Sequence, residues 1–175
     1  HQAVADVISN NAPDVIINAA AYTAVDKAES ERALAYAVNS DAVANLAQLA
    51  RQVNAWLIHF STDYVFDGAA DAPYSETAAT NPMGVYGASK LAGEQAIAAS
   101  GCRHLIIRTA WVFSPFGQNF LKTMLRLGGE RDELNVVADQ IGCPTFAGDL
   151  ADAIVATLTT INAGTCPWGL YHYAG

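Results

Sequence analysis

The sequence predicts an α/β protein with a doubly wound parallel sheet. Short apolar runs alternate along the chain with longer segments of helical periodicity. Strands that alternate with helices imply parallel βαβ crossovers. A chain of 175 residues is large enough for one sizeable core, so we expect residues 1–175 to form a single domain.

The strands are predicted from apolar runs of four to six residues that are rich in Val, Ile, Leu and aromatic residues. Runs of this kind are typical of strands that are buried on both faces. The predicted strands are 15–20, 56–61, 104–109, 134–137 and 170–173.

The helices are predicted from apolar residues that recur at helical spacing. The first stops before Pro13, and the longest is rich in Ala and Leu, as expected of a helix that packs on a sheet. A loop with Gly68, Pro73 and Pro82 separates the second strand from the next helix. The predicted helices are 2–11, 29–53, 84–99, 120–127 and 149–161.

Composition excludes several classes of function. A formal net charge of −8 argues against a nucleic-acid surface, because phosphate neutralisation needs clustered Lys and Arg. No apolar run reaches the roughly 18 residues that a membrane span requires. Cys102, Cys143 and Cys166 share no metal-ligand spacing with the histidines, so we interpret them as reduced thiols of a cytoplasmic protein.

The strongest chemical signal lies between residues 56 and 90. Tyr86 and Lys90 are four residues apart in a predicted helix and share one face. A Lys ammonium beside a Tyr phenol favours the phenolate and lowers the phenol pKa, and such a pair can exchange a proton with a carbonyl or alcohol. Thr62, at the end of the preceding strand, has a hydroxyl that could bind the same substrate oxygen. The sequence therefore predicts a carbonyl/alcohol redox site.

Several motifs together resemble one known family. They are Asn18-Ala19-Ala20-Ala21-Tyr22-Thr23-Ala24-Val25-Asp26, Val38-Asn39, Phe60-Ser61-Thr62-Asp63-Tyr64-Val65-Phe66-Asp67-Gly68, Tyr86-Gly87-Ala88-Ser89-Lys90 and Arg108-Thr109-Ala110-Trp111-Val112-Phe113. This succession resembles the dTDP-4-dehydrorhamnose reductases, which are extended short-chain dehydrogenase/reductases with a Rossmann-like fold. The resemblance covers essentially all 175 residues.

The resemblance implies hydride transfer from NADPH or NADH to the C4 keto group of a dTDP-sugar. Tyr86 would donate the proton, Lys90 would lower its pKa and bind the nicotinamide ribose, and Thr62 would orient the carbonyl. The remaining implied contacts are of two kinds. Cofactor contacts are Ala20, Ala21, Tyr22, Thr23 and Asn39, together with Tyr86 and Lys90; substrate contacts are Thr62, Asp63 and Trp111.

The same resemblance makes the chain a partial domain. It contains no Gly-x-Gly-x-x-Gly or Gly-x-x-Gly-x-x-Gly turn, which would follow the first strand of a dinucleotide-binding sheet. We therefore expect a fragment that lacks the first βα unit and the C-terminal portion. The family is also linked to Mg²⁺, whose ligands this segment does not assign, and a homodimer is compatible with it.

Two alternatives stay open at this point. A sugar-nucleotide 4-epimerase of the same superfamily uses the same Tyr and Lys, and a non-catalytic homologue could bind a nucleotide as a regulatory subunit. A 4,6-dehydratase is disfavoured because Tyr64 stands where that pattern has Glu. His59 alternates with apolar residues in a predicted buried strand, so we interpret it as a core histidine.

Overall fold

The computed structural model describes residues 2–175, which divide into two compact units. The first unit takes in the chain up to Arg108 together with Trp168–His172. The second takes in Thr109–Pro167 and Tyr173–Gly175. The single domain expected from the chain length remains a prediction.

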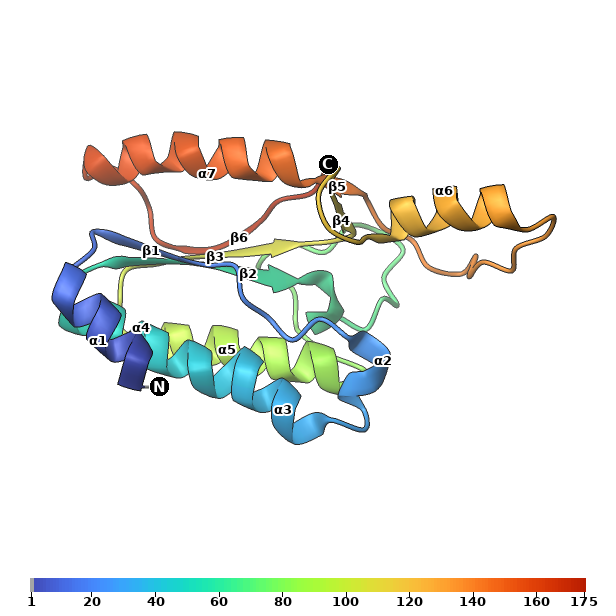
Figure 1. Ribbon diagram of the computed structural model, residues 1–175. Helices are drawn as coiled ribbons and strands as arrows, with labels where there is room; N and C mark the ends of the chain where they lie inside the picture. Colours follow the sequence, from blue (N-terminus) through green and yellow to red (C-terminus); the bar gives the residue numbers. More distant parts are fainter. Residues whose placement is uncertain (1) are drawn as a thin grey trace. The chain divides into compact units, whose positions relative to one another are not determined.

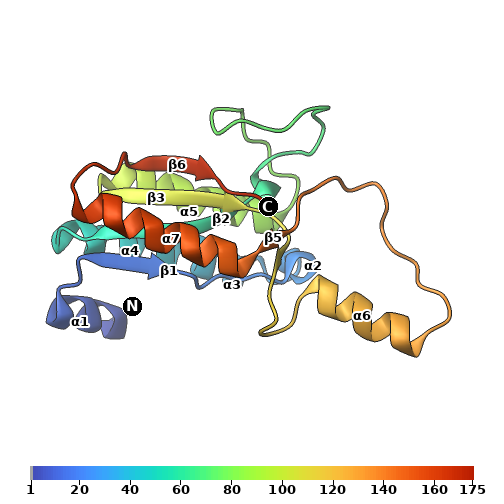
Figure 2. The ribbon, with the colours of Figure 1, turned by 90° about the horizontal axis from the view of Figure 1, so that it is seen from above.

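A parallel sheet organises the first unit. Its four strands are β1 (Val15–Asn18), β2 (Trp56–Thr62), β3 (His104–Thr109) and β6 (Gly169–His172), in the order β1-β2-β3-β6. The outer pairs β1–β2 and β3–β6 are parallel, and Figure 2 shows β1 and β6 at the two edges of the sheet. The predicted α/β class and four of the five predicted strands are therefore confirmed.

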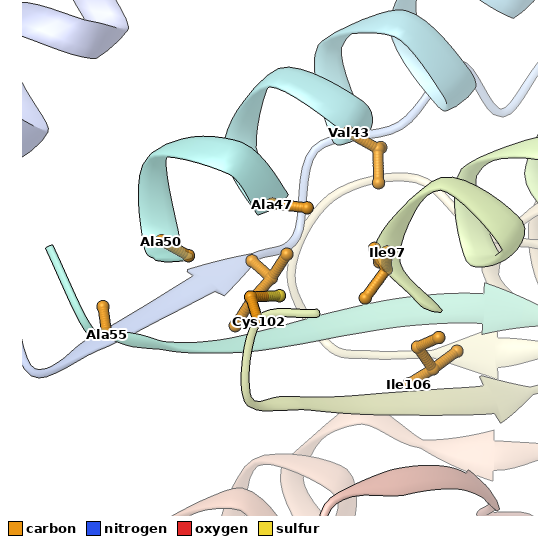
Figure 3. Packing of buried hydrophobic residues seen from close by; sticks show 8 residues of the cluster. Val43, Ala47, Ala50, Ala55, Ile97, Cys102 and Ile106 are labelled. Carbon is orange, nitrogen blue, oxygen red and sulfur yellow. The ribbon is translucent and has the colours of Figure 1, made fainter. Parts of the chain in front are cut away.

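Helices α1 (Gln2–Asn11), α4 (Ala42–Gln52) and α5 (Val85–Ser100) lie on one face of this sheet (Figure 1). Small residues on α4 allow close approach, so the helices and strands share a densely packed core. Helix α5 ends at Gly101, whose φ of 71° is the left-handed conformation common after a helix. The core residues, shown in Figure 3, are Val43, Ala47, Ala50, Ala55, Leu57, Ile97, Cys102 and Ile106.

The helix predicted for residues 29–53 is confirmed from Arg32 to Gln52, where the helical backbone runs without a break, but its first residues are not helical and its regular α geometry is wrong. The structure has a short helix α2 (Val25–Ala28), a break, α3 (Arg32–Tyr36), a π-helical turn η1 (Ala37–Asp41) and then α4. The π turn holds Asn39, whose buried amide bonds to the backbone of Tyr22 and to the Ser89 hydroxyl. Apolar periodicity does not reveal a π-helical turn of this kind, because hydrogen bonds to residues distant in sequence stabilise it.

The second unit contains α6 (Phe120–Glu130), α7 (Ala147–Asn162) and two short parallel strands, β4 (Val112–Phe113) and β5 (Thr145–Phe146). Both helices were predicted, whereas the two-residue strands were not. The strand predicted at 134–137 is wrong: these residues form no regular element, and Val136 and Val137 are 52% and 68% exposed. A strand needs a hydrogen-bonding partner, and this segment pairs with none of the strands in residues 2–175.

No helix within residues 2–175 combines the length and apolar character that crossing a bilayer requires. The three cysteines are free thiols: Cys102 is buried in the core, Cys166 is partly buried and Cys143 is exposed.

Candidate active site

Thr62 is the last residue of β2 and begins the turn that follows the strand. Its hydroxyl accepts a hydrogen bond from the Tyr64 amide at 3.2 Å and donates to the Asp63 carboxylate at 3.0 Å. These contacts build the 3-10 turn η2 (Asp63–Val65) at the carboxyl end of the strand. Ligands of open parallel sheets bind at this end, so the turn places Thr62 where a substrate would be held.

Tyr86, Lys90 and Glu94 follow one another at four-residue spacing along α5 and lie on one face of the helix. Gly87 allows α5 to approach η2, because a Cβ at this position would stand 2.1 Å from the Tyr64 carbonyl oxygen. The Tyr64 and Tyr86 rings meet edge to face, with their centroids 5.5 Å apart. The Thr62 hydroxyl is close enough to the Tyr86 phenol to lower its pKa. The structure thus brings the predicted Thr62 and Tyr86 together.

The predicted lowering of the Tyr86 pKa by Lys90 is wrong for this structure. Burial raises the pKa of Tyr86 above 10, the nearby Thr62 hydroxyl lowers it in part, and the negative charge of Asp63 raises it further. Lys90 is not among the groups that act on this pKa. Tyr86 is therefore a protonated phenol at neutral pH, which is the form that a proton donor needs.

Lys90 is buried, and its amine faces strand β2. The Nζ atom donates to the Phe60 carbonyl oxygen at 2.6 Å and lies 3.3 Å from His59 Nε2. Burial lowers the pKa of Lys90 to about 8, against the opposing attraction of Glu94. The amine is therefore poised near neutral pH rather than fixed as a cation.

Sequence reasoning missed the ion pair that anchors this face of α5. Arg108 of β3 holds the Glu94 carboxylate with two hydrogen bonds, Nε to Oε1 at 2.9 Å and Nη2 to Oε2 at 2.6 Å. The Ser61 hydroxyl donates to the same carboxylate, and both charged side chains are buried. The spacing of Lys90 and Glu94 was a usable signal, whereas nothing in the sequence joins Glu94 to Arg108.

The predicted cofactor turn, residues 20–23, follows β1 and is exposed or half-buried. Asn39 pairs with Tyr22 as a neighbouring strand would: its Oδ1 accepts from the Tyr22 amide at 2.9 Å, and its Nδ2 donates to the Tyr22 carbonyl at 3.0 Å. The same Nδ2 lies 3.0 Å from the Ser89 hydroxyl of α5. Asn39 therefore ties the turn to the helix that carries Tyr86.

Two predicted substrate contacts occupy different units. Asp63 adjoins Thr62, and burial raises the pKa of its carboxyl group. Trp111 belongs to the second unit, where it is 44% exposed and its φ of 47° is unusual for a bulky residue. Strained backbone of this kind clusters at functional sites.

The Mg²⁺ that the resemblance implies finds no ligand set here. Among residues 2–175, no three His, Cys, Asp or Glu side chains lie close enough together to hold a metal ion.

Comparison with known proteins gives a consistent result. The chain is 52% identical over 174 residues to the dTDP-4-dehydrorhamnose reductase of Sinorhizobium fredii, covering 98% of this chain and 59% of the relative. It is 50% identical over 171 residues to the reductase of the same name from Escherichia coli K12, covering 98% of this chain and 57% of the relative. The chain thus spans about three fifths of the length of these curated relatives.

Solved structures match the fold closely. The dTDP-4-dehydrorhamnose reductase of Bacillus anthracis in complex with NADP superimposes with a TM-score of 0.93 at 43% identity, over 99% of this chain and 60% of that one. The UDP-glucose 4-epimerase of Brucella ovis, at 20% identity and a TM-score of 0.81, shares the fold alone.

A family model described as the RmlD substrate binding domain matches residues 1–175. Because that match runs from the first residue to the last, the chain belongs to the RmlD substrate binding domain family.

Proposed function

We propose that the protein containing this chain reduces the C4 keto group of dTDP-4-dehydro-L-rhamnose to an alcohol, with NADPH or NADH as the reductant. The relatives at about 50% identity carry the name of this reaction. Because the chain spans 59% of the first relative, the activity is proposed for the protein as a whole.

The contact between the Thr62 hydroxyl and the Tyr86 phenol is the observation that carries the proposal. It joins a proton donor to a second hydroxyl at the carboxyl end of β2, so both can reach one substrate oxygen. A bound nicotinamide supplies the hydride. Tyr86 then donates its proton to the oxygen that becomes the alcohol, and Thr62 stabilises the negative charge that develops on that oxygen.

The cofactor would lie along the residue 20–23 turn, with Tyr86 and Lys90 at its ribose. The turn is exposed at the carboxyl end of β1, and Asn39 holds its backbone in place. The NADP in the Bacillus anthracis reductase supports NADPH over NADH. Asp63 would hold the sugar nucleotide beside Thr62, and the family resemblance adds Trp111 as a further substrate contact. The proposed homodimer rests on the family resemblance, and the proposed cytoplasmic location rests on the interpretation of the three cysteines as reduced thiols.

The deciding experiment measures cofactor oxidation. The full-length protein is mixed with dTDP-4-dehydro-L-rhamnose and NADPH, and absorbance of the reduced cofactor is followed beside product analysis. A reductase consumes the two substrates in equimolar amounts. An epimerase would convert the sugar without net oxidation, and a regulatory subunit would bind without converting it; either result contradicts the proposal.

A further inference from the structure

Asn18 and His59 are paired across β1 and β2, next to the proposed site but outside it. They are register partners in the parallel sheet, and both are buried, at 7% and 0% exposure. Asn18 Nδ2 lies 3.0 Å from His59 Nδ1. On its other edge, His59 Nε2 lies 3.3 Å from Lys90 Nζ. The two residues therefore connect the end of β1 to the Lys90 amine.

The direction of the first hydrogen bond is fixed by the backbone. The Ala20 amide lies 3.2 Å from the Asn18 side chain, and an amide N–H can only donate. The Asn18 atom that faces it must be the oxygen, so the Asn18 NH₂ group faces His59. An NH₂ group has no acceptor, and His59 Nδ1 must therefore be the unprotonated nitrogen.

The proton of His59 then has only one place to be. Burial and the nearby Lys90 lower the pKa of His59 to about 3, so the ring is neutral. A neutral ring unprotonated at Nδ1 carries its hydrogen on Nε2, which faces Lys90. An ammonium group has no lone pair to accept this hydrogen, whereas a neutral amine has one. The contact therefore favours the neutral form of Lys90.

The other groups near Lys90 also affect whether its amine is neutral or protonated. The Phe60 carbonyl accepts from Nζ at 2.6 Å, which either form of the amine allows. Glu94, one turn further along α5, favours the ammonium form, but Arg108 and Ser61 already hold its carboxylate. Tyr86, one turn before Lys90, remains protonated and adds no charge. Burial lowers the pKa of the amine, and the His59 edge adds a contact that only the neutral amine can accept.

We infer that Asn18 and His59 are positioning residues that join the Ala20 amide of the residue 20–23 turn to Lys90, with Asn18 fixing the His59 tautomer that presents Nε2–H to the amine. The tautomer follows from the geometry alone. Its consequence for catalysis rests on the proposed function. Activity falls at alkaline pH as Lys90 loses its proton, and residue 18, acting through His59, sets the pH at which this happens.

The test uses nuclear magnetic resonance on the full-length protein, with ¹⁵N in the His rings and ¹³C at the Lys Cε atoms. The ring nitrogen shifts distinguish Nδ1–H from Nε2–H, and a Lys90→Met variant identifies the Lys90 signal. Wild type is compared with Asn18→Asp, whose two oxygens accept from the Ala20 amide and from His59. His59 must then move its hydrogen to Nδ1, and Nε2 becomes an acceptor for the ammonium.

The expected result is an Nε2–H ring in wild type and an Nδ1–H ring in Asn18→Asp, with the Lys90 titration midpoint raised by about one pH unit or more. The alkaline limb of activity should move by the same amount. A double variant, Asn18→Asp with His59→Gln, keeps the added charge but removes the ring, and its Lys90 midpoint should move less.

An Nδ1–H ring in wild type would overturn the inference, and this measurement needs no variant to fold. An unmoved Lys90 midpoint in Asn18→Asp, or the same rise in the double variant, would also overturn it. The proposed function is tested separately. Cofactor oxidation by a protein whose His59 ring is protonated at Nδ1 would contradict this inference but not the proposed function. An Nε2–H ring in a protein without turnover would contradict the proposed function but not the tautomer.

Discussion

Burial affects Tyr86 and Lys90 in opposite directions. Leaving water disfavours the charged form of each group, so it raises the pKa of the phenol and lowers that of the amine to about 8. As pH rises, Lys90 therefore loses its proton before Tyr86. Tyr86 therefore stays protonated at every pH at which Lys90 titrates. Above a pH of about 8 the Lys90 amine is mostly neutral.

His59 gives a prediction about stability. The pKa of His59 falls from 6.5 to about 3 in the folded protein, so between these values the unfolded chain binds the proton and the folded chain does not. The contribution of His59 to the free energy of unfolding is complete above pH 6.5. It is lost as pH falls toward 3, and the loss amounts to about 5 kcal/mol at 1.36 kcal/mol per pH unit. Urea unfolding across this range measures the loss.

The matched variant is His59→Gln, which keeps an amide that can hydrogen-bond but does not titrate. The difference in unfolding free energy between wild type and this variant should shrink or reverse as the solution becomes acidic. Parallel curves from pH 7 to pH 3 would show that His59 is not a buried neutral ring.

Local spacing explains which site residues the sequence could predict. Tyr86 and Lys90 share a helix, so four-residue spacing was enough to place them on one face. Asn18 and His59 lie 41 residues apart and meet only when β1 and β2 align in register. The sequence indicated that His59 is buried in a strand, which is confirmed, but it could not show which groups face the ring.

At the scale of elements, α5 is held at several points along its length. The Glu29 carboxylate accepts from the Val85 amide at 2.8 Å and caps the start of the helix. The Glu94–Arg108 pair ties its middle to β3. Gly93 allows the π turn to approach, since a Cβ there would stand 2.2 Å from the Asn39 carbonyl oxygen. These contacts fix where the helix presents Tyr86.

Replacing Gly93 with Ala should therefore destabilise the protein although Ala is the better helix former. The helix interior gains up to about 1 kcal/mol from the change, but the clash with Asn39 costs about 1–3 kcal/mol and pushes the π turn away. Thermal unfolding measures the balance, and cofactor affinity should fall with it because Asn39 holds Tyr22.

Gly128→Ala in α6 is the control, because nothing lies within 4 Å of a Cβ there. This variant should be neutral or slightly stabilising. If Gly93→Ala behaves like Gly128→Ala, the close packing of α5 on the π turn is not what holds Asn39 in place.

Apolar patterns predicted where strands and helices lie, but they did not predict where a helix departs from regular geometry. The strands at 56–61 and 104–109 appear in the structure because each is a run of residues that only a buried strand accommodates. The helix at 29–53 was predicted as regular α-helix because Ala and Leu recur throughout it, whereas the π turn depends on Asn39 reaching Tyr22, seventeen residues earlier. Residues 134–137 have strand composition but no partner.

At the scale of the whole molecule, the 175-residue chain alone should show no turnover. Its sequence has no glycine-rich turn, and such a turn together with a helix N-terminus binds the cofactor pyrophosphate. Cofactor titration and oxidation assays on the isolated chain, beside the full-length protein, measure this. Turnover comparable to that of the full-length protein would show that residues 1–175 contain a complete pyrophosphate site.

The central claim is that Tyr86, which lies beside the Thr62 hydroxyl, donates the proton to the reduced carbonyl. Its most direct test compares kcat and KM for NADPH oxidation by the full-length protein and its Tyr86→Phe variant with dTDP-4-dehydro-L-rhamnose. Removing a general acid should lower kcat by about 100-fold or more while KM for the sugar changes little. A variant that retains its kcat would contradict the assignment of Tyr86 as the proton donor.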